Sequence, residues 1–583
     1  MKKPILQHAI RLLLAVCLVA PSAPRASEPS SAKSPDLLLA TMHEELRRAT
    51  TELGNLDPAP YFLSYSVYDQ EVLSIAASYG AILNSATGRR RTADVTMRVG
   101  SPTLDNTHNE NRTSGITSGT LPLGEDRDAI ARVLWQLTYR GYRRAAPAYL
   151  NVKTSTAVRT EEEDKSADFS QEAPQNRVES ASAAFRVDPK AWEERIRRYS
   201  SYFRKHPEVY TSTVTLQVQS SRSYFVSSEG SSIVTPSALA RLVLQGETLA
   251  EDGMELFRVE SFQAPTPEQL PPEAEIASRI EKMAADLKAL RAAPTAEPFA
   301  GPALLSGRAA AVFFHEVLGH RVEGHRQRDE REGQTFTKKV NHQVLPEFLS
   351  VVDDPTGREL NGVKLGGWYE YDDEGVPASR VEVIKDGVLK NFLMSRMPVK
   401  NFSKSNGHGR AQPGRMATGR QGNLVVTSSR TVKDAELRQK LIEEVKKQGK
   451  PYGLYFEDVQ GGFTLTIRAL PQAFQVLPVM VWRVYVDGRP DELVRGVDIV
   501  GTPLAALNRI VLTGDTLQVF NGICGAESGN VPVAAAAPAM LFSEVEVQKR
   551  PHSRTRPPIL PPPGFESGAQ RSAQNQPPGG AQP

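Results

Sequence analysis

Apolar side chains recur at helical spacing in the first half of the chain. The segments 34–53, 126–144 and 271–291 each place apolar residues three and four positions apart, with charged residues between them. A further helix is expected around 191–203. This spacing is typical of amphipathic helices that bury one face.

Strand-like runs fall between these helices. Apolar and β-branched residues predict strands at 61–67, 75–83, 92–99, 210–218, 223–227 and 238–245. The charged stretch 159–177 is predicted to be an exposed connection. The order helix, strands, helix, strands, helix indicates a mixed α+β domain over residues 27–296. We find no catalytic pattern in it and expect a substrate groove or a subunit interface there.

After a short linker at 292–296, strand patterns dominate the sequence. Residues 376–384 and 388–393 flank Lys385-Asp386-Gly387, and Asp-Gly at such a position predicts a hairpin turn. The runs 480–488 and 538–547 continue the alternation. We therefore expect a mainly β domain over residues 297–549, with one buried helix packed on it. The fold class as a whole is α+β.

That helix is apolar on nearly every side, although it carries ionisable residues. Residues 308–314 are mostly alanine, valine and phenylalanine, and they lead into His315-Glu316-Val317-Leu318-Gly319-His320. A helix apolar all round is normally buried, where imidazoles and a carboxylate are unfavourable unless they are paired or bind a metal. In helical zinc peptidases two histidines ligate the ion and a glutamate activates water. Histidines that occur by chance in a buried helix are the alternative.

The spacing of the two histidines has a structural consequence. Residues five apart lie roughly 140° from each other on a regular α-helix, too far round to share one ion. The helix is therefore expected to unwind at its C-terminal end or to carry a π-bulge. Gly319 is the residue expected to permit this, because glycine accepts backbone angles that other residues avoid.

A peptidase metal needs three protein ligands and one open position. From the residues alone there are two candidates for the third ligand, His325 and Cys524, and neither is excluded. Cys524 lies between glycines that would let a thiolate approach an ion. The only other cysteine of the chain is Cys17, so an intramolecular disulfide is not expected once the N-terminal segment is removed.

The two ends of the chain look unlike its interior. Lys2, Lys3 and a short apolar run before small residues predict a cleaved signal peptide over residues 1–26, and thus export to the periplasm or medium. A lipid anchor at Cys17 is the alternative. We expect no stable membrane insertion after cleavage, because the apolar run is short. Residues 550–583 are rich in proline and glycine and predict a disordered tail.

Composition narrows the classes of function only a little. At 583 residues, the chain has room for two or three domains. A hydrophobic content of 40% and a charged content of 23% are ordinary for globular proteins. The net charge of +3, without a basic patch, indicates no nucleic-acid partner.

Several sequence blocks resemble the TldD/PmbA metallopeptidase family, once described as modulators of DNA gyrase. They occur in family order over roughly 250 residues and are specific to the C-terminal half. The blocks are residues 315–320 with Glu323-Gly324, 374–379, Asp386-Gly387, 393–396, Gly407-His408-Gly409-Arg410, Cys524-Gly525 and Val531-Pro532-Val533.

The resemblance implies a site and a reaction. It implies that His315, His320 and Cys524 bind one Zn²⁺ per chain and that Glu316 is the catalytic base. It also implies peptides or unfolded segments as substrate, and a homodimer or a heterodimer with a related subunit. We expect His408 and Arg410, in the glycine-rich block, to stabilise the oxyanion. His325 and His342 are expected not to be ligands.

The leading hypothesis is thus a zinc-dependent peptidase. A non-catalytic binding or regulatory subunit with a structural metal is the alternative, although such a site has no need of Glu316 and usually has four protein ligands. A cysteine-dependent hydrolase that pairs Cys524 with a histidine is a third hypothesis, and it leaves Glu316 without a role.

Overall fold

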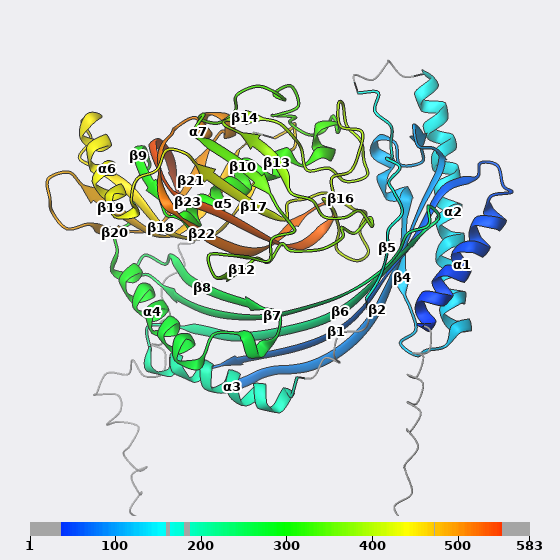
Figure 1. Ribbon diagram of the computed structural model, residues 1–583. Helices are drawn as coiled ribbons and strands as arrows, with labels where there is room; N and C mark the ends of the chain where they lie inside the picture. The colour runs from blue at the N-terminus through cyan, green and yellow to red at the C-terminus, as the bar shows by residue number, and fades with distance from the viewer. Residues whose placement is uncertain (1–35, 159–163, 180–186, 471–472, 551–583) are drawn as a thin grey trace, which may run out of the picture.

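The structure is a computed structural model that describes residues 36–158, 164–179, 187–470 and 473–550. It is mixed α+β and has two large sheets, the first wrapped around the region that contains the second (Figure 1). The predicted signal peptide and nearly all of the predicted tail lie outside the described residues, and export stays a prediction. No helix in the described ranges is long and apolar enough to cross a bilayer.

The first sheet is built from very long strands. Its order is β3-β2-β1-β6-β7-β5, with β4 beside β2 and β8 beside β7. At about 3.3 Å per residue, the 19 residues of β1 span about 60 Å. The strands are β1 (Pro60–Ser78), β2 (Ala81–Ser101), β3 (Leu104–Asp105), β4 (Ile116–Thr120), β5 (Asn176–Val178), β6 (Thr211–Ser227), β7 (Ser232–Leu249) and β8 (Glu255–Ala264).

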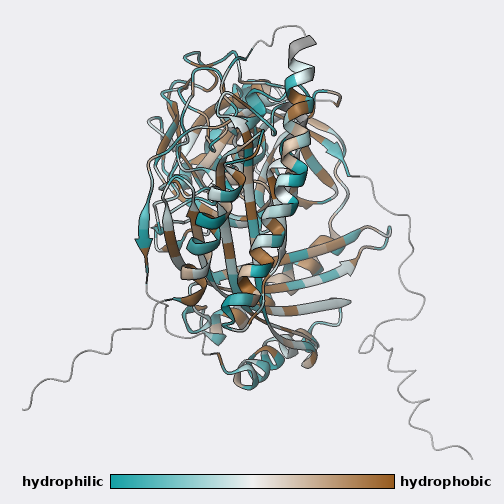
Figure 2. Cartoon of the chain, turned by 90° about the vertical axis from the view of Figure 1, so that its right-hand side faces the viewer, coloured by the Kyte–Doolittle hydropathy of each residue, from teal (hydrophilic) through white to brown (hydrophobic). Residues whose placement is uncertain are grey.

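Helices cover only the convex face of this sheet. Odd-numbered residues of β1 pack against helices at both ends of the strand, with Leu63 and Tyr65 at one end and Ile75 and Ala77 at the other. The helices α1 (Leu37–Leu53) and α2 (Arg127–Val158) cover the first end, and α3 (Pro189–Ser201) and α4 (Glu273–Ala292) cover the second. Polar and apolar segments mix along α1 and α2 in Figure 2, as expected for helices with one buried face. The concave face is left for the rest of the chain.

The breaks expected between 61–67 and 75–83 and between 210–218 and 223–227 are wrong, because β1 and β6 each run through the break without interruption. The expected strand 75–83 also contains the turn between β1 and β2. The polar residues Asp69-Gln70-Glu71 look like a break in the pattern, but Asp69 accepts hydrogen bonds from Arg89 and Arg91 on β2, at 2.7 Å each. Cross-strand ion pairs thus satisfy polar residues inside the sheet. β8 was not predicted, and α2 runs 14 residues beyond its expected end at Arg144.

The expectation that 159–177 is an exposed connection holds for most of residues 171–177 but is wrong for residues 168–170. Asp168, Phe169 and Ser170 are buried. Asp168 Oδ1 lies 2.7 Å from His108 Nδ1 and 3.0 Å from Arg328 Nη2. This segment therefore joins the first sheet to the loop that follows the metal motif.

The second sheet carries the candidate site. Its order is β14-β13-β10-β17-β23-β21-β19-β18-β9, with β20 beside β19, β22 beside β23, and β23 also beside β9. The strands are β9 (Phe299–Leu305), β10 (Leu349–Asp353), β13 (Val381–Lys385), β14 (Val388–Leu389), β17 (Asn423–Ser428), β18 (Tyr452–Thr464), β19 (Phe474–Tyr485), β20 (Glu492–Val494), β21 (Val497–Gly501), β22 (Ile510–Ala526) and β23 (Gly529–Lys549). Two small hairpins, β11 (Glu359–Leu360) with β12 (Val363–Lys364) and β15 (Gly409–Arg410) with β16 (Thr418–Gly419), lie beside it.

The predicted buried helix, α5 (Gly307–Val317), packs on β23, β22 and β18. Ala303 and Leu305 of β9 pack in its core, whereas Leu304 points to the other face, toward α6 (Asp434–Lys447). The short helix α7 (Pro503–Leu507) completes this half. The hairpin at Asp386-Gly387 is present, and both residues have positive φ, 46° and 78°. The prediction of a buried helix on a mainly β domain is confirmed.

Arg396 provides a test of how the two halves are joined. Its buried guanidinium lies 4.9 Å from the ring centre of Phe62 and 4.0 Å from that of Phe169, and it donates to Glu229 at 2.7 Å. We expect Arg396→Ala to lower the free energy of unfolding by about 2–4 kcal/mol, because it leaves Glu229 unpaired and opens the aromatic stack. Denaturant unfolding would measure this loss. Arg438→Ala removes an exposed ion pair with Asp491 and should change the free energy of unfolding by under about 1 kcal/mol. Equal losses in the two variants would contradict the role of Arg396 in joining the two halves.

Candidate metal centre

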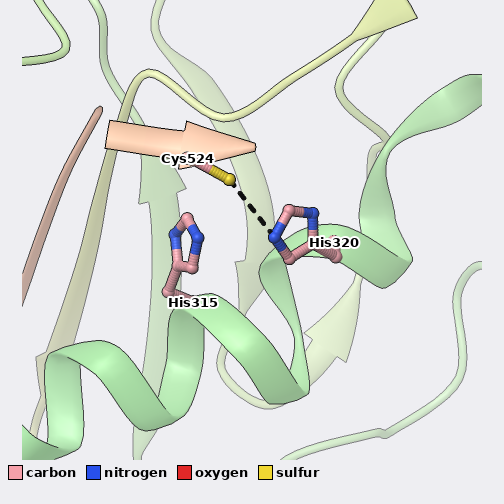
Figure 3. Close-up of side chains that lie close together, drawn as sticks. All are labelled: His315, His320 and Cys524. Carbon is pink, nitrogen blue, oxygen red and sulfur yellow. Dashed lines mark hydrogen bonds between the residues drawn. The ribbon is translucent and has the colours of Figure 1, made fainter. Parts of the chain in front are cut away.

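Three potential metal ligands meet at the C-terminal end of α5. His315 is in the last turn of the helix, His320 follows in a 3₁₀ turn (Gly319–Val322), and Cys524 comes from β22. One ligand atom of each residue lies within 4.8 Å of the other two. Figure 3 shows the two rings facing the cysteine sulfur, with His320 Nε2 3.3 Å from Cys524 Sγ. The chain thus brings together two imidazoles and one thiol from distant parts of the sequence.

The helix unwinds as the histidine spacing predicts. The last helical residue is Val317, Leu318 has φ −110° and ψ −53°, and the 3₁₀ turn begins at Gly319. The ring centres of His315 and His320 consequently lie 4.9 Å apart. The reason given for Gly319 is wrong, because its φ is not positive. A Cβ atom there would lie 2.0 Å from Gln421 Oε1, so glycine is needed for the close approach of that side chain.

Glu323 orients His320 toward the site. Its Oε1 lies 3.1 Å from His320 Nδ1, and Arg326 donates to its other oxygen at 2.8 Å. Burial tends to raise the pKa of Glu323, but His320 and Arg326 lower it to about 2, so this carboxylate is ionised. Nδ1 of His320 therefore donates to Glu323, and Nε2 faces Cys524. A histidine held by a carboxylate in this way is typical of metal ligands.

Cys524 is a buried free cysteine with a low pKa. Burial alone would raise the pKa of its thiol, but His320 and His315 outweigh this effect and lower it to about 4. Arg420 donates to the Cys524 carbonyl oxygen at 2.9 Å and so fixes the strand at this point. Two nitrogen donors and a thiolate suit zinc, and three protein ligands leave one position open. The residues present fit the ion that the sequence predicts.

Glu316 lies beside these three residues, and its carboxylate has no partner in the described part of the chain. The side chain is 5% exposed and lies against β18, where a Cβ on Gly462 would approach its Cγ to 2.7 Å. Burial raises the pKa of Glu316, although His315 and His320 oppose this effect. A carboxyl group with a raised pKa, facing a cavity and unpaired, is suited to accept and return a proton.

The site opens into a cavity of about 1900 Å³ between the two sheets. His315, Glu316, His320 and Cys524 all line it. The other walls include the segment 457–467, strand β22, and residues 258–264 of β8 in the first sheet. The long N-terminal strands therefore form one side of the candidate site; a substrate groove is one of the two roles expected of that half.

His408 and Arg410, the expected oxyanion-stabilising residues, do not line this cavity. His408 is fully buried, with Nε2 3.3 Å from Asp353 Oδ1 and Nδ1 3.0 Å from Asn406. Arg410 donates to the carbonyl oxygens of Gln421 and Pro532, at 2.7 and 2.8 Å. Because both side chains hold loops together, neither is placed to stabilise an oxyanion, and this part of the prediction is corrected.

The remaining histidines lie apart from the three donors. His325 is not placed beside them; its Nε2 bonds instead to Glu527. His342 is exposed, with Nδ1 3.0 Å from the Val340 carbonyl oxygen. The sequence analysis missed the roles of Glu323 and Arg420. The signal for Glu323 is its position three residues after His320, the spacing at which neighbouring side chains on a helical turn meet.

The second half of the chain is similar to known metalloproteases. Residues 300–549 match the family model of the PmbA/TldA metallopeptidase C-terminal domain. The chain is 29% identical over 233 residues to a metalloprotease of Archaeoglobus fulgidus, covering 40% of this chain and 49% of the relative. It is 26% identical over 249 residues to a zinc metalloprotease TldD homolog of Saccharolobus solfataricus, covering 42% and 51%. The chain thus spans about half the length of the curated relatives it matches.

Two solved structures share the fold over nearly the whole described chain. A protein of Thermotoga maritima described as a modulator of a DNA gyrase superposes with a TM-score of 0.58 at 16% identity, covering 87% of this chain and 99% of that one. TldE from Thermococcus kodakarensis gives a TM-score of 0.56 at 13% identity, covering 87% and 100%. At such identities the likeness concerns the fold alone.

Removing the charge of Glu323 tests how the histidine is held. We expect Glu323→Gln to weaken zinc binding about 10–100-fold, because the His320 ring loses its anionic partner. Competition with a chromophoric chelator would measure the affinity. Glu332→Gln is the matched control, since Glu332 also pairs with Arg326, at 2.8 Å, but does not contact His320. Unchanged zinc affinity in Glu323→Gln would contradict this role.

Proposed function

Because residues 300–549 belong to the PmbA/TldD metallopeptidase family, we propose that the chain is a zinc-dependent peptidase with one catalytic centre. Its ligands are His315, His320 and Cys524, and its general base is Glu316. The observation that carries the proposal is the meeting of these three donors beside an unpaired carboxylate, all on the wall of one large cavity.

Different residues of the site would have different roles in amide hydrolysis. A zinc ion bound here would act as a Lewis acid and make water acidic enough to lose a proton near neutral pH. Glu316 accepts that proton and returns it to the amine leaving group, and its raised pKa suits both steps. Glu323 keeps His320 in the tautomer that presents Nε2. The buried setting of the site strengthens each of these electrostatic effects.

The size of the cavity supports peptides or unfolded segments as substrate. Sites for small molecules usually enclose about 300–1000 Å³, and this one is larger. The exposed apolar side chains Phe463, Ile467 and Ile523 also line it and could contact apolar substrate residues. The proposal includes a dimer, of one chain or with a related subunit, on the strength of the family resemblance.

A specific observation favours a second candidate, a cysteine-dependent hydrolase. Cys524 Sγ lies 3.3 Å from His320 Nε2, and its pKa is lowered to about 4, as in thiolate–imidazolium pairs. This reading gives no role to His315 or Glu316. A chelator distinguishes the two: zinc chemistry is lost on metal removal and restored by added zinc, whereas a cysteine nucleophile is indifferent to the metal.

Substitution of the base gives the sharpest test of the proposed function. We expect Glu316→Gln to keep about one zinc per chain and to lose about 10²–10⁴-fold in kcat on a fluorogenic peptide, because no other group takes the proton. Cys524→Ala should lose both metal and activity. Glu275→Gln, an exposed glutamate on the cavity wall, is the control and should retain activity.

Two results would contradict this proposal. Full peptidase activity in Glu316→Gln would show that Glu316 is not the general base. A wild-type chain that binds zinc but hydrolyses no peptide, even with related subunits added, would favour a non-catalytic binding subunit.

A further inference from the structure

Two polar side chains on the concave face of the first sheet point to a ligand. Arg241 on β7 and Gln263 on β8 are direct cross-strand partners. Their neighbours Leu242 and Ala264 belong to the core beneath α3 and α4, so Arg241 and Gln263 project from the opposite face. Both line the cavity that contains the candidate metal centre.

Neither side chain has a hydrogen-bond partner in the described part of the chain. Arg241 Nε and both amide atoms of Gln263 are buried and unsatisfied. Other cavity arginines are paired: Arg258 with Asp458 at 2.8 Å, and Arg326 with Glu332 at 2.8 Å. Arg415 has no ion pair within the described ranges, but it is exposed to water. Burial lowers the pKa of Arg241, and no acidic neighbour offsets this effect. Buried polar groups left unsatisfied are unfavourable unless a ligand completes them.

The pair lies at a defined distance along the wall from the metal centre. A Cβ on Gly366 would lie 2.9 Å from Gln263 Oε1 and 3.2 Å from Asn521 Oδ1, so these two side chains meet at that glycine. Asn521 precedes Cys524 by three residues on β22, about 10 Å along the strand. Arg241 is one strand further away, about 5 Å.

We propose that Arg241 and Gln263 bind a carboxylate of the peptide substrate about three to five residues from the scissile bond. A guanidinium presents a planar fork that matches a carboxylate, and the Gln263 amide adds a donor. An extended peptide rises about 3.3 Å per residue, so three to five residues span the separation between the pair and Cys524. This inference rests on the proposed function, because it places the pair in a substrate-binding cavity. The carboxylate belongs either to the C-terminus of the peptide or to an acidic side chain.

The test measures binding rather than turnover. Three fluorescently labelled hexapeptides share one sequence and end in a free carboxylate, in an amide, or in an amide after a final aspartate. They are titrated into the full zinc-loaded chain carrying Glu316→Gln, with and without Arg241→Gln. Arg415→Gln is the matched control, because it removes another cavity arginine that has no ion pair in the described ranges.

We expect the free-acid peptide to bind about 10–100-fold more tightly than the amide, and Arg241→Gln to abolish that difference while Arg415→Gln keeps it. If the aspartate peptide recovers the affinity, the site accepts a side-chain carboxylate; if it does not, the site reads the C-terminus. Arg241→Gln should leave the temperature of thermal unfolding unchanged or slightly raised, because it removes a partly buried guanidinium that has no acidic partner in the described ranges. A large fall in thermal stability would indicate a structural arginine and overturn the inference.

The carboxylate site would also be overturned if the free-acid and amide peptides bound equally well, or if the difference between them survived Arg241→Gln. Either result would count against this site even if the wild type hydrolyses peptides. Conversely, an Arg241-dependent preference in a chain that hydrolyses nothing would support the carboxylate site and reject the proposed peptidase. The two claims can therefore fail separately.

Discussion

The candidate site depends on ionisable groups at the edge of a hydrophobic core, where opposite charges must offset the free energy that their desolvation costs. Phe313, Phe314 and Val317 of α5 are buried in the main core, and the same helix carries His315 and Glu316. Desolvation of two imidazoles, a thiolate and a carboxylate is strongly unfavourable unless opposite charges or a metal offset it. The ionised Glu323 compensates His320, and Cys524 compensates both histidines. A zinc ion would complete this balance.

The two sheets have different tasks around this point. β23 is a 21-residue central strand that pairs with β9, β17, β21 and β22, so the strand carrying Cys524 is held rigidly against the helix carrying the histidines. The first sheet offers no ligand to the metal centre. Its long strands curve around the second half instead and supply the opposite wall of the cavity (Figure 1). Under the proposed function, the residues that contact substrate on this wall therefore come from a different half of the chain than the metal donors.

The sequence predicted those features that depend on residues close together in the chain. The apolar surroundings of His315 and His320, and their five-residue spacing, led to a buried helix that unwinds at its end. The choice of Cys524 over His325 came from the family resemblance, because nothing local joins Cys524 to the helix. The roles expected for His408 and Arg410 were wrong because the sequence of a glycine-rich block does not show what it faces. The same residues could line a cavity or, as His408 does, contact the buried Asp353. The break expected near Asp69 was wrong because its arginine partners are distant in sequence. The proposed role of Arg241 could not be predicted for the same reason. Whether its guanidinium has a partner depends on residues that are distant in sequence.

The central claim is that one ion is held by two imidazoles and one thiolate. X-ray absorption at the zinc edge of the zinc-loaded full chain tests it most directly. The account predicts one sulfur at about 2.3 Å, two imidazole nitrogens at about 2.0–2.1 Å, and one further light atom, in tetrahedral coordination. Loss of the sulfur contribution in Cys524→Ala would identify its source. A wild-type spectrum without sulfur, or with six light atoms around the ion, would contradict the account.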